Sequence, residues 1–338
     1  MKDEKLVEVA QKLGFAKSTV SRTARHCSGV DAETRRLILR YMDEAGITLE
    51  KECSVYAIQP DTPNYFWGEF AKILAKADTE ERIFLKQNIY TTLGDSDIVL
   101  RYLEEAEKIS PPVLILSAHI TPEIREILLR MKEKTTVFLL AEYDSVPYTF
   151  YIGADSYGDG YRMGECFCRR CPERTPVVVT NTESPTVCLR VKGFCDALRQ
   201  FDPQRFDRIP VYDYPLVYIH CGKKQLAPSR LAAQLAEWIG GRSNCCLYIP
   251  FGTGALSLAL QKAKFGEKVL CFTHDSMLTS SGSPEKGIAA TMNQNVHAES
   301  REAIRAAVEL ITTGMCPDGK YTYIPSELYL SPTLGAEN

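Results

Sequence analysis

The chain has 338 residues, of which 45% are hydrophobic and 25% are charged. This is ordinary globular composition, which excludes a globally disordered or collagen-like chain, and the length suggests two or three domains. The formal net charge of -3 excludes a uniformly basic nucleic-acid-binding surface but permits a local basic patch.

Three short helices are predicted over the first 46 residues. Apolar side chains recur at helical spacing over residues 6–13, and Gly14 follows where a helix would stop. A second helix fits about residues 16–24, and a third fits residues 31–45, with Asp31 as its N-cap. Two short helices joined by a glycine turn and backed by a third are typical of a helix-turn-helix, although a small helical cap with solvated charges fits the same pattern.

The second of these helices carries the chemistry that suits DNA. Its outward positions hold Lys, Ser, Thr and Arg side chains, which can read base edges in the major groove and bind phosphates. Residues 1–46 contain nine Lys or Arg and seven Asp or Glu, so the segment carries a local charge of about +2. We therefore consider this segment a candidate DNA-binding head.

The string from Val9 to Arg22, VAQKLGFAKSTVSR, strongly resembles the DNA-binding head of the LacI/GalR family of transcriptional regulators. Residues 30–35 resemble that family's entry into its third helix. The resemblance implies contacts to base edges or to the DNA backbone for six residues. The base-edge residues would be Lys17, Ser18 and Arg22, and the backbone residues would be Thr19, Ser21 and Arg25.

The segment after the head departs from the family. There the family has a linker and a hinge helix that carries a proline, a basic pair and a leucine that wedges into the minor groove. Residues 47–54 read ITLEKECS, without proline and without a basic pair, and about a dozen family residues are absent. The minor-groove wedge is therefore expected to be lost, and the family's allosteric mechanism does not transfer directly.

From Ser54 onward, short apolar runs alternate with helical patterns, which predicts doubly wound parallel sheets. So many strands favour two sheets over a single wide one, with ligands at the carboxyl ends of the strands. The expected fold class is α/β, a small all-α helix-turn-helix head followed by a two-lobed body. The predicted boundaries are 1–46 for the head, 47–54 for a short linker, 55–335 for the ligand-binding domain, about 55–152 and 278–313 for lobe 1, and about 153–275 and 320–335 for lobe 2.

The body also resembles the ligand domain of the LacI/GalR family, whose fold is shared with periplasmic sugar-binding proteins. The motifs occur in the family's order: residues 60–70 after the first strand, DSYG at 155–158, RVKGFCDAL at 190–198 and ATMNQ at 290–294. The resemblance implies a periplasmic-binding-protein-like body that binds a sugar-like effector.

A sugar presents apolar ring faces and a rim of hydroxyls, so aromatic rings and fixed donors and acceptors would hold it. Tyr65, Phe66 and Trp67 are candidates for a stacking platform, or they fill the lobe core. Asp155 and Arg190 are candidates for acceptor and donor, or they serve as a helix cap and a surface helix residue.

Further candidates follow from departures in the second half of the body. Phe251 stands where the family often has a polar pair, and we expect it to stack on the ligand. Either His274 or Asp275 would take the family's ligand-facing acidic role. Gln294 would contact either the ligand or the crossover strands.

Other signals point away from metal or enzyme chemistry. Cys166, Cys168 and Cys171 contain a single CxxC pair, whereas zinc sites commonly use two, so we expect packed thiols, no metal and no cofactor. No nucleophile-base arrangement is evident, so we do not expect an enzyme. No 18-residue apolar stretch or apolar signal core is seen, so we expect no membrane partner, a cytoplasmic location and reduced thiols.

These observations predict a sequence-specific DNA-binding transcriptional regulator, a probable repressor, that is controlled by a sugar-like small molecule. Its partners would be a double-stranded DNA operator, the effector and a second copy of itself in a homodimer. The main alternative is a small-molecule-binding sensor module whose head no longer binds DNA. An enzyme, or a DNA-binding protein without an effector, are further alternatives.

Overall fold

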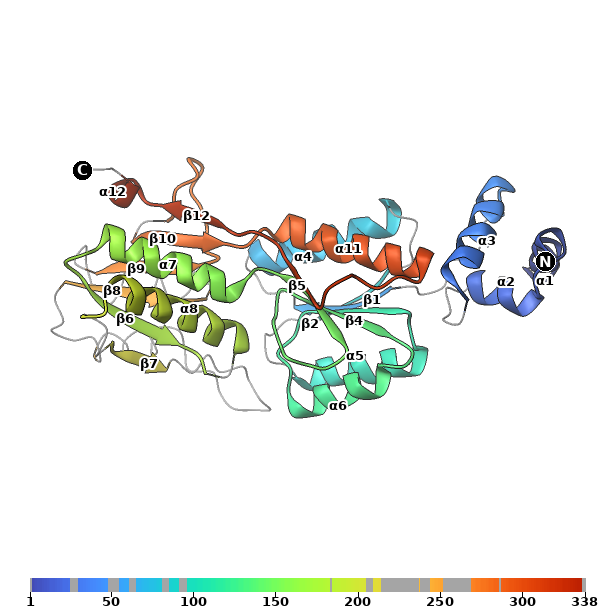
Figure 1. The fold of residues 1–338 in the computed structure, drawn as a ribbon, viewed down its shortest axis with the longest axis horizontal. Helices are drawn as coiled ribbons and strands as arrows, with labels where there is room; N and C mark the ends of the chain where they lie inside the picture. Colours follow the sequence, from blue (N-terminus) through green and yellow to red (C-terminus); the bar gives the residue numbers. More distant parts are fainter. Residues whose placement is uncertain are drawn as a thin grey trace. The chain divides into compact units, whose positions relative to one another are not determined.

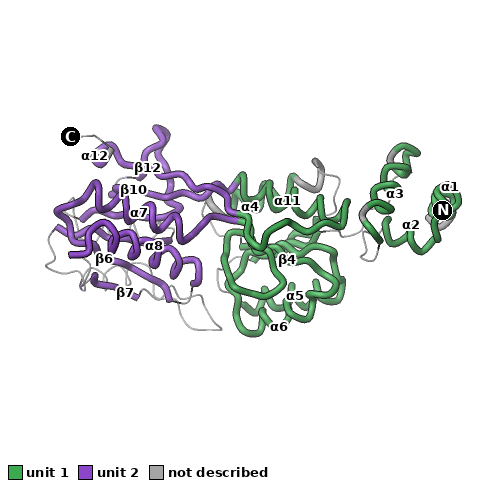
Figure 2. The backbone as a smooth tube through the Cα atoms, viewed as in Figure 1, with its two compact units in different colours: residues 1–63, 67–152, 297–322 green, residues 64–66, 153–296, 323–338 purple. Residues whose placement is uncertain are grey.

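The computed structural model describes residues 2–24, 30–47, 55–60, 65–80, 85–90, 96–182, 184–204, 209–213, 237, 244–251, 269–285 and 287–335. The chain divides into two compact units (Figure 2). Unit 1 consists of residues 1–63, 67–152 and 297–322, and unit 2 consists of residues 64–66, 153–296 and 323–338.

The chain begins with three helices, α1 (Lys2–Leu13), α2 (Lys17–Ala24) and α3 (Ala32–Glu44), drawn in blue in Figure 1. They share an apolar cluster that includes Val9, Val20 and Ile38, all fully buried. Gly14 makes the turn between α1 and α2 with a φ of 74°, a conformation that favours glycine. Asp31 caps α3 by accepting a hydrogen bond from the Thr34 amide at 2.9 Å. The three predicted helices are thus present.

Unit 1 contains a six-stranded sheet in the order β11-β5-β4-β3-β1-β2. The neighbouring pairs from β5 to β2 are parallel, as expected when helices connect successive strands. The strands are β1 (Val55–Pro60), β2 (Leu85–Tyr90), β3 (Val113–Leu116), β4 (Thr136–Leu140), β5 (Thr149–Gly153) and β11 (Tyr321–Tyr323). The helices are α4 (Tyr65–Glu80), α5 (Ser96–Ile109), α6 (Pro122–Met131) and α11 (Val296–Thr313).

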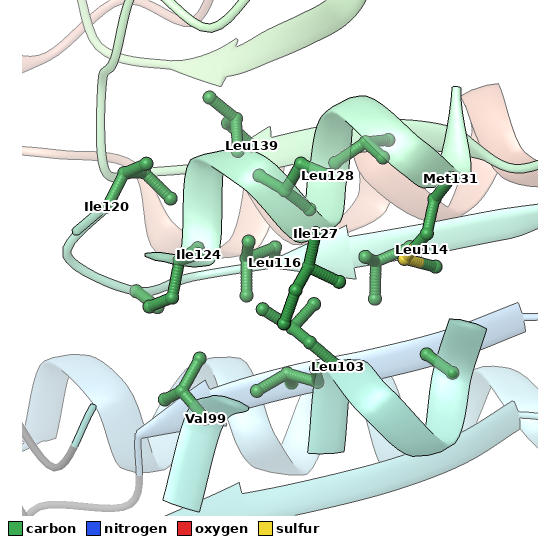
Figure 3. Packing of buried hydrophobic residues seen from close by; sticks show 14 of the residues in the cluster. Val99, Leu103, Leu114, Leu116, Ile120, Ile124, Ile127, Leu128, Met131 and Leu139 are labelled. Carbon is green, nitrogen blue, oxygen red and sulfur yellow. The ribbon is translucent and has the colours of Figure 1, made fainter. Parts of the chain in front are cut away.

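The described core of unit 1 forms where α5 and α6 cover one face of this sheet (Figure 3). Leu103 of α5 and Leu128 of α6 pack with Leu114 and Leu116 of β3. All four residues of β3 are buried, which is typical of a central parallel strand covered on both faces.

Unit 2 contains a second six-stranded sheet in the order β12-β10-β9-β8-β6-β7. The pairs from β10 to β7 are parallel, and β12 lies antiparallel to β10. The strands are β6 (Thr175–Thr180), β7 (Val211–Asp213), β8 (Cys245–Ile249), β9 (Leu270–His274), β10 (Ile288–Asn293) and β12 (Glu327–Leu330). The helices are α7 (Ser156–Arg170), α8 (Pro185–Phe201) and α12 (Pro332–Gly335).

Helices α7 and α8 lie side by side with their backbones in contact (Figure 1). A methyl group added at Gly160 would lie against the carbonyl group of Arg190, 2.7 Å from its carbon. A methyl group added at Gly193 would meet the backbone of Tyr157 and, at 2.8 Å, the amide nitrogen of Tyr161. Only glycine at these positions permits so close an approach.

The predicted two-sheet, parallel-rich α/β architecture is confirmed, but the boundaries between the units differ from the predicted lobes. The sequence placed residues 278–313 in lobe 1, whereas β10 pairs with β9 and β12 and so belongs to the second sheet. The chain returns to unit 1 at His297. Residues 321–323, predicted in lobe 2, form β11 at the edge of the first sheet.

Candidate ligand-binding site

The parallel strands of unit 2 end at one edge of the sheet, and Arg190 joins two of these ends. Its Nη1 donates to the carbonyl oxygen of Pro250, just after β8, at 3.0 Å. Its Nη2 lies 3.4 Å from Oδ2 of Asp275, just after β9. The Arg190 and Asp275 side chains are only 4% and 9% exposed, so this ion pair is shielded from solvent. Arg190 is therefore a buried residue of the strand edge and not the surface helix residue of the alternative prediction.

Gln294, just after β10, completes this cluster. Its backbone amide donates to Oδ1 of Asp275 at 3.0 Å, and its Nε2 donates to Oδ2 at 2.8 Å. Both carboxylate oxygens of Asp275 thus accept hydrogen bonds. The remaining side-chain atom of Gln294, Oε1, is buried and has no hydrogen-bond partner within the described part of the chain. Buried polar atoms in folded proteins are mostly hydrogen-bonded, so this oxygen is a candidate acceptor for a hydroxyl donor of a ligand.

The turn that carries Asp275 is held by a closed polar network. Asp275 has a φ of 52°, which is uncommon for a residue other than glycine. On either side of the turn, Oγ1 of Thr273 lies 2.7 Å from Oγ of Ser276, and Nδ2 of Asn293 donates to the Ser276 carbonyl at 2.9 Å. Thr291 accepts from the Ser276 amide at 3.3 Å. These bonds fix the strained backbone and hence the direction of the Asp275 carboxylate.

Tyr248 of β8 and His274 of β9 form a second buried polar pair beside Arg190. The Tyr248 hydroxyl lies 2.9 Å from Nε2 of His274, and the Tyr248 ring stacks on Phe194 at 4.0 Å. Burial and, to a lesser extent, the charge of Arg190 hold the pKa of His274 well below its ordinary value, so this imidazole is neutral. His274 is therefore not an acidic group, so of the two candidates only Asp275 can take the predicted ligand-facing acidic role, which stays a prediction.

Asp159, in the first turn of α7, contributes a further buried carboxylate. Its Oδ2 accepts from the Ser326 hydroxyl at 2.6 Å, and Arg162 lies 3.6 Å from its Oδ1. Burial raises the pKa of Asp159, while the Ser326 hydrogen bond and the charges of Arg190 and Arg162 lower it. Asp159 thus places a second negative charge near Arg190, held by its own hydrogen bond to Ser326.

The other predicted ligand residues lie as follows. Asp155 is exposed and caps α7 by accepting from the Gly158 amide at 3.0 Å, which is the alternative role considered for it. Phe251 is buried after β8, in the same unit as the Arg190 cluster. In unit 1, Trp67 is buried and packs on Phe70 with ring centroids 5.6 Å apart. The side chains of Tyr65 and Phe66 lie outside the described residues, and a ligand role for each of these five residues stays a prediction.

Helix α2 presents most of the predicted DNA-contacting residues. Val20, Thr23 and Ala24 form its buried face, whereas Lys17, Ser18 and Arg22 are exposed and Thr19 and Ser21 are half-buried. Arg25 lies outside the described residues. The predicted base-edge residues are thus available on one helix.

Sequence reasoning missed Tyr248, Asp159, Asn293 and Ser326. Tyr248 lies in the apolar run CCLYI and reads as a core strand residue, and Asp159 reads as an ordinary first-turn acid of α7. The alternation of side chains along β8, which places Tyr248 on the side of α8, could have been predicted from the sequence. Its polar partner, His274 on β9, could not. Only the order of the strands brings these groups together.

Among the described residues, no group of three or more histidine, cysteine or acidic side chains is placed to hold a metal ion. The helices described here include none with the length and hydropathy that a membrane span requires.

Comparison with solved structures identifies the architecture. The glucose-galactose binding protein GanP from Geobacillus stearothermophilus has a TM-score of 0.65 at 18% identity, covering 85% of this chain and all of that one. A Caulobacter myo-inositol binding protein bound to myo-inositol has a TM-score of 0.66 at 16% identity, covering 86% of this chain and 97% of that one. A galactofuranose binding protein has a TM-score of 0.66 at 17% identity, covering 84% and 96%.

No protein-family model and no curated protein matches the sequence. At these identities the structural likeness establishes the fold alone, which is that of periplasmic-binding-protein-like proteins. The predicted fold of the body is thereby confirmed, while the relationship to the LacI/GalR family stays a prediction.

Proposed function

We propose that the chain is a small-molecule-binding sensor module whose ligand is a sugar or a similar polyhydroxylated compound. The Arg190–Asp275–Gln294 cluster carries this proposal. Its three side chains come from three different elements, meet at the carboxyl edge of a parallel sheet, and are buried. Such edges are where ligands bind in open α/β folds, and paired fixed donors and acceptors match the hydroxyl groups of a sugar. The solved structures of similar fold are named for glucose, galactose, myo-inositol and galactofuranose binding, which supports the same ligand class.

A thermal-shift screen tests this function. A panel of neutral sugars, polyols, sugar phosphates and nucleosides should contain a compound that raises the melting temperature. A ligand present at a concentration of 100 times its Kd stabilises the native state by about 2.7 kcal/mol. Asp275→Asn keeps the shape of the side chain but removes its charge, and we expect it to abolish the shift. Asp318→Ala, an exposed control, should leave the shift unchanged. A panel without any stabilising compound would contradict the proposal.

A second function is favoured by the head. Helix α2 exposes Lys17, Ser18 and Arg22 on a helix whose opposite face is buried, which is the requirement for reading the major groove. The full regulator would be a homodimer whose two heads bind half-sites related by a dyad, with the sugar-like ligand controlling operator affinity. The alternative is a sensor that binds the same ligand but whose head does not bind DNA.

Footprinting on the DNA that flanks the protein's own gene separates these alternatives. If the head reads DNA, Arg22→Ala should weaken binding by about 1–3 kcal/mol, which is roughly fivefold to 150-fold. Arg36→Ala, which removes an exposed charge from α3, should have a much smaller effect. Absence of salt-sensitive, sequence-selective binding by the unaltered chain would leave the sensor function alone.

A further inference from the structure

The hydroxyl of Tyr248 makes two contacts that together define the positions of hydrogen atoms. It lies 3.4 Å from the carbonyl oxygen of Arg190 and 2.9 Å from Nε2 of His274. A carbonyl oxygen can only accept, so the contact to Arg190 is a hydrogen bond when the hydroxyl hydrogen points to that carbonyl. The Tyr248 oxygen must then accept from His274, and Nε2 of His274 must carry a hydrogen.

The other ring nitrogen of His274 agrees with this assignment. In a neutral imidazole with hydrogen on Nε2, Nδ1 is a bare acceptor. Nδ1 is buried and has no hydrogen-bond partner among the residues that the structure describes. An unpaired buried acceptor costs less than an unpaired buried N–H and is less rare in folded proteins. The opposite tautomer would bury an N–H without an acceptor.

Tyr248 is also fixed by packing against the helix that carries Arg190. Its ring stacks on Phe194 with an interplanar angle of 9°, and Phe194 lies one helical turn after Arg190 on α8. Gly160 also lets the backbone of α7 approach the Arg190 carbonyl group. The backbone of Arg190 is thus held by Tyr248, while its guanidinium reaches Pro250 and Asp275.

We propose that His274 and Tyr248 form a hydrogen-bonded relay, from Nε2–H to the tyrosine oxygen and from the tyrosine O–H to the Arg190 carbonyl, that positions Arg190 for ligand binding. The effect on ligand binding rests on the proposed function, whereas the hydrogen bonds of the relay do not. Tyr248 and His274 are positioning residues, because they act on the ligand through Arg190. A purely apolar pair at these places would pack as well but would remove the side-chain hydrogen bond to the Arg190 carbonyl.

Nitrogen-15 NMR of histidine-labelled protein tests the relay without any ligand. The chain has five histidines, and the loss of one signal set in His274→Gln assigns His274. We expect the shifts of a neutral ring with hydrogen on Nε2 and none on Nδ1. Tyr248→Phe should move the Nε2 signal, whereas Tyr161→Phe, which removes a hydroxyl bonded to Gln200 at 2.7 Å on the exposed side of α7, should not. Hydrogen on Nδ1 in the unaltered protein would overturn the relay.

Calorimetry with D-galactose and myo-inositol as probes tests its effect on binding. Loss of one net hydrogen bond of about 1 kcal/mol predicts an affinity roughly fivefold lower in Tyr248→Phe and in His274→Phe. His274→Gln retains an N–H donor for Tyr248 and should recover most of the affinity, which a merely space-filling role would not explain. Equal affinities in Tyr248→Phe and Tyr161→Phe would show that the relay does not position Arg190. If neither probe binds the unaltered protein, binding of these sugars fails as a function, while the NMR result still decides the relay.

Discussion

The burial of His274 has a direct consequence for the pH dependence of stability. The folded protein holds this ring neutral, with a pKa well below 6.5, whereas the unfolded chain protonates it near 6.5. Below that pH the unfolded state binds a proton that the folded state does not bind. The stability of the folded state with respect to His274 is therefore complete above about pH 6.5, and it is lost as the pH falls toward the folded-state pKa.

We therefore expect acid sensitivity that depends on this single side chain. The free energy of unfolding should fall by up to about 1.4 kcal/mol per pH unit below pH 6.5 relative to His274→Gln, which lacks the titrating ring. Denaturant unfolding of both proteins between pH 5 and 8 measures this difference. His297→Gln removes an exposed histidine and should retain the slope of the unaltered protein. Parallel pH profiles for all three proteins would show that His274 is not protected from protonation.

Cysteines in different surroundings should react at very different rates, because the thiolate is the reactive form. Burial raises the pKa of Cys271 to about 12 and those of Cys166 and Cys195 to about 11. Cys316 is exposed. Brief treatment with iodoacetamide at pH 8 followed by peptide mass spectrometry should find Cys316 modified first and Cys271 modified only after unfolding. Rapid modification of Cys271 in the native protein would contradict its burial in β9.

At the scale of elements, the contact between α7 and α8 positions Arg190 and with it the proposed ligand site. Alanine is more favourable than glycine inside a helix by about 1 kcal/mol, so Gly160→Ala alone would stabilise α7. The added methyl group would, however, meet the Arg190 carbonyl. Overpacking of this kind costs about 1–3 kcal/mol, so we expect net destabilisation, together with weaker ligand binding as Arg190 moves.

Gly68→Ala is the matched control for this substitution. Gly68 also lies within a helix, α4, but a methyl group there would meet no atom within 4 Å. It should leave the free energy of unfolding unchanged or raise it. Equal stability of the two variants, measured by urea unfolding, would mean that α7 and α8 do not approach as closely as the backbone indicates.

The sequence could predict the helices and strands better than it could predict which unit each of them belongs to. Periodicity and glycine turns identify α1 to α3 and the alternation of strands and helices, because these are local properties. They do not reveal that residues 288–293 pair with β9, since strand order is set by packing across the sheet. Arg190, Asp275 and Gln294 were recognised through motif resemblance, whereas the Tyr248–His274 pair needed the register of β8 against β9.

At the scale of the whole molecule, the proposed sensor and regulator functions are linked by thermodynamic coupling. If ligand changes the affinity of the head for its operator by some factor, the operator must change the affinity for ligand by the same factor. Titrating ligand with and without operator DNA checks this reciprocity. Identical ligand affinities in the presence and absence of specifically bound DNA would mean that the two functions are uncoupled.

Hydrogen exchange with the compound found by the thermal-shift screen tests the central claim most directly. Binding at the carboxyl edge of the second sheet should slow exchange of the amides in the turn after β9 and of Gln294, which donates to Asp275. The same compound should leave these amides unchanged in Asp275→Asn. Protection that appears only within α1–α3 or only in the sheet of unit 1, with residues 274–276 and 294 unaffected, would contradict the account.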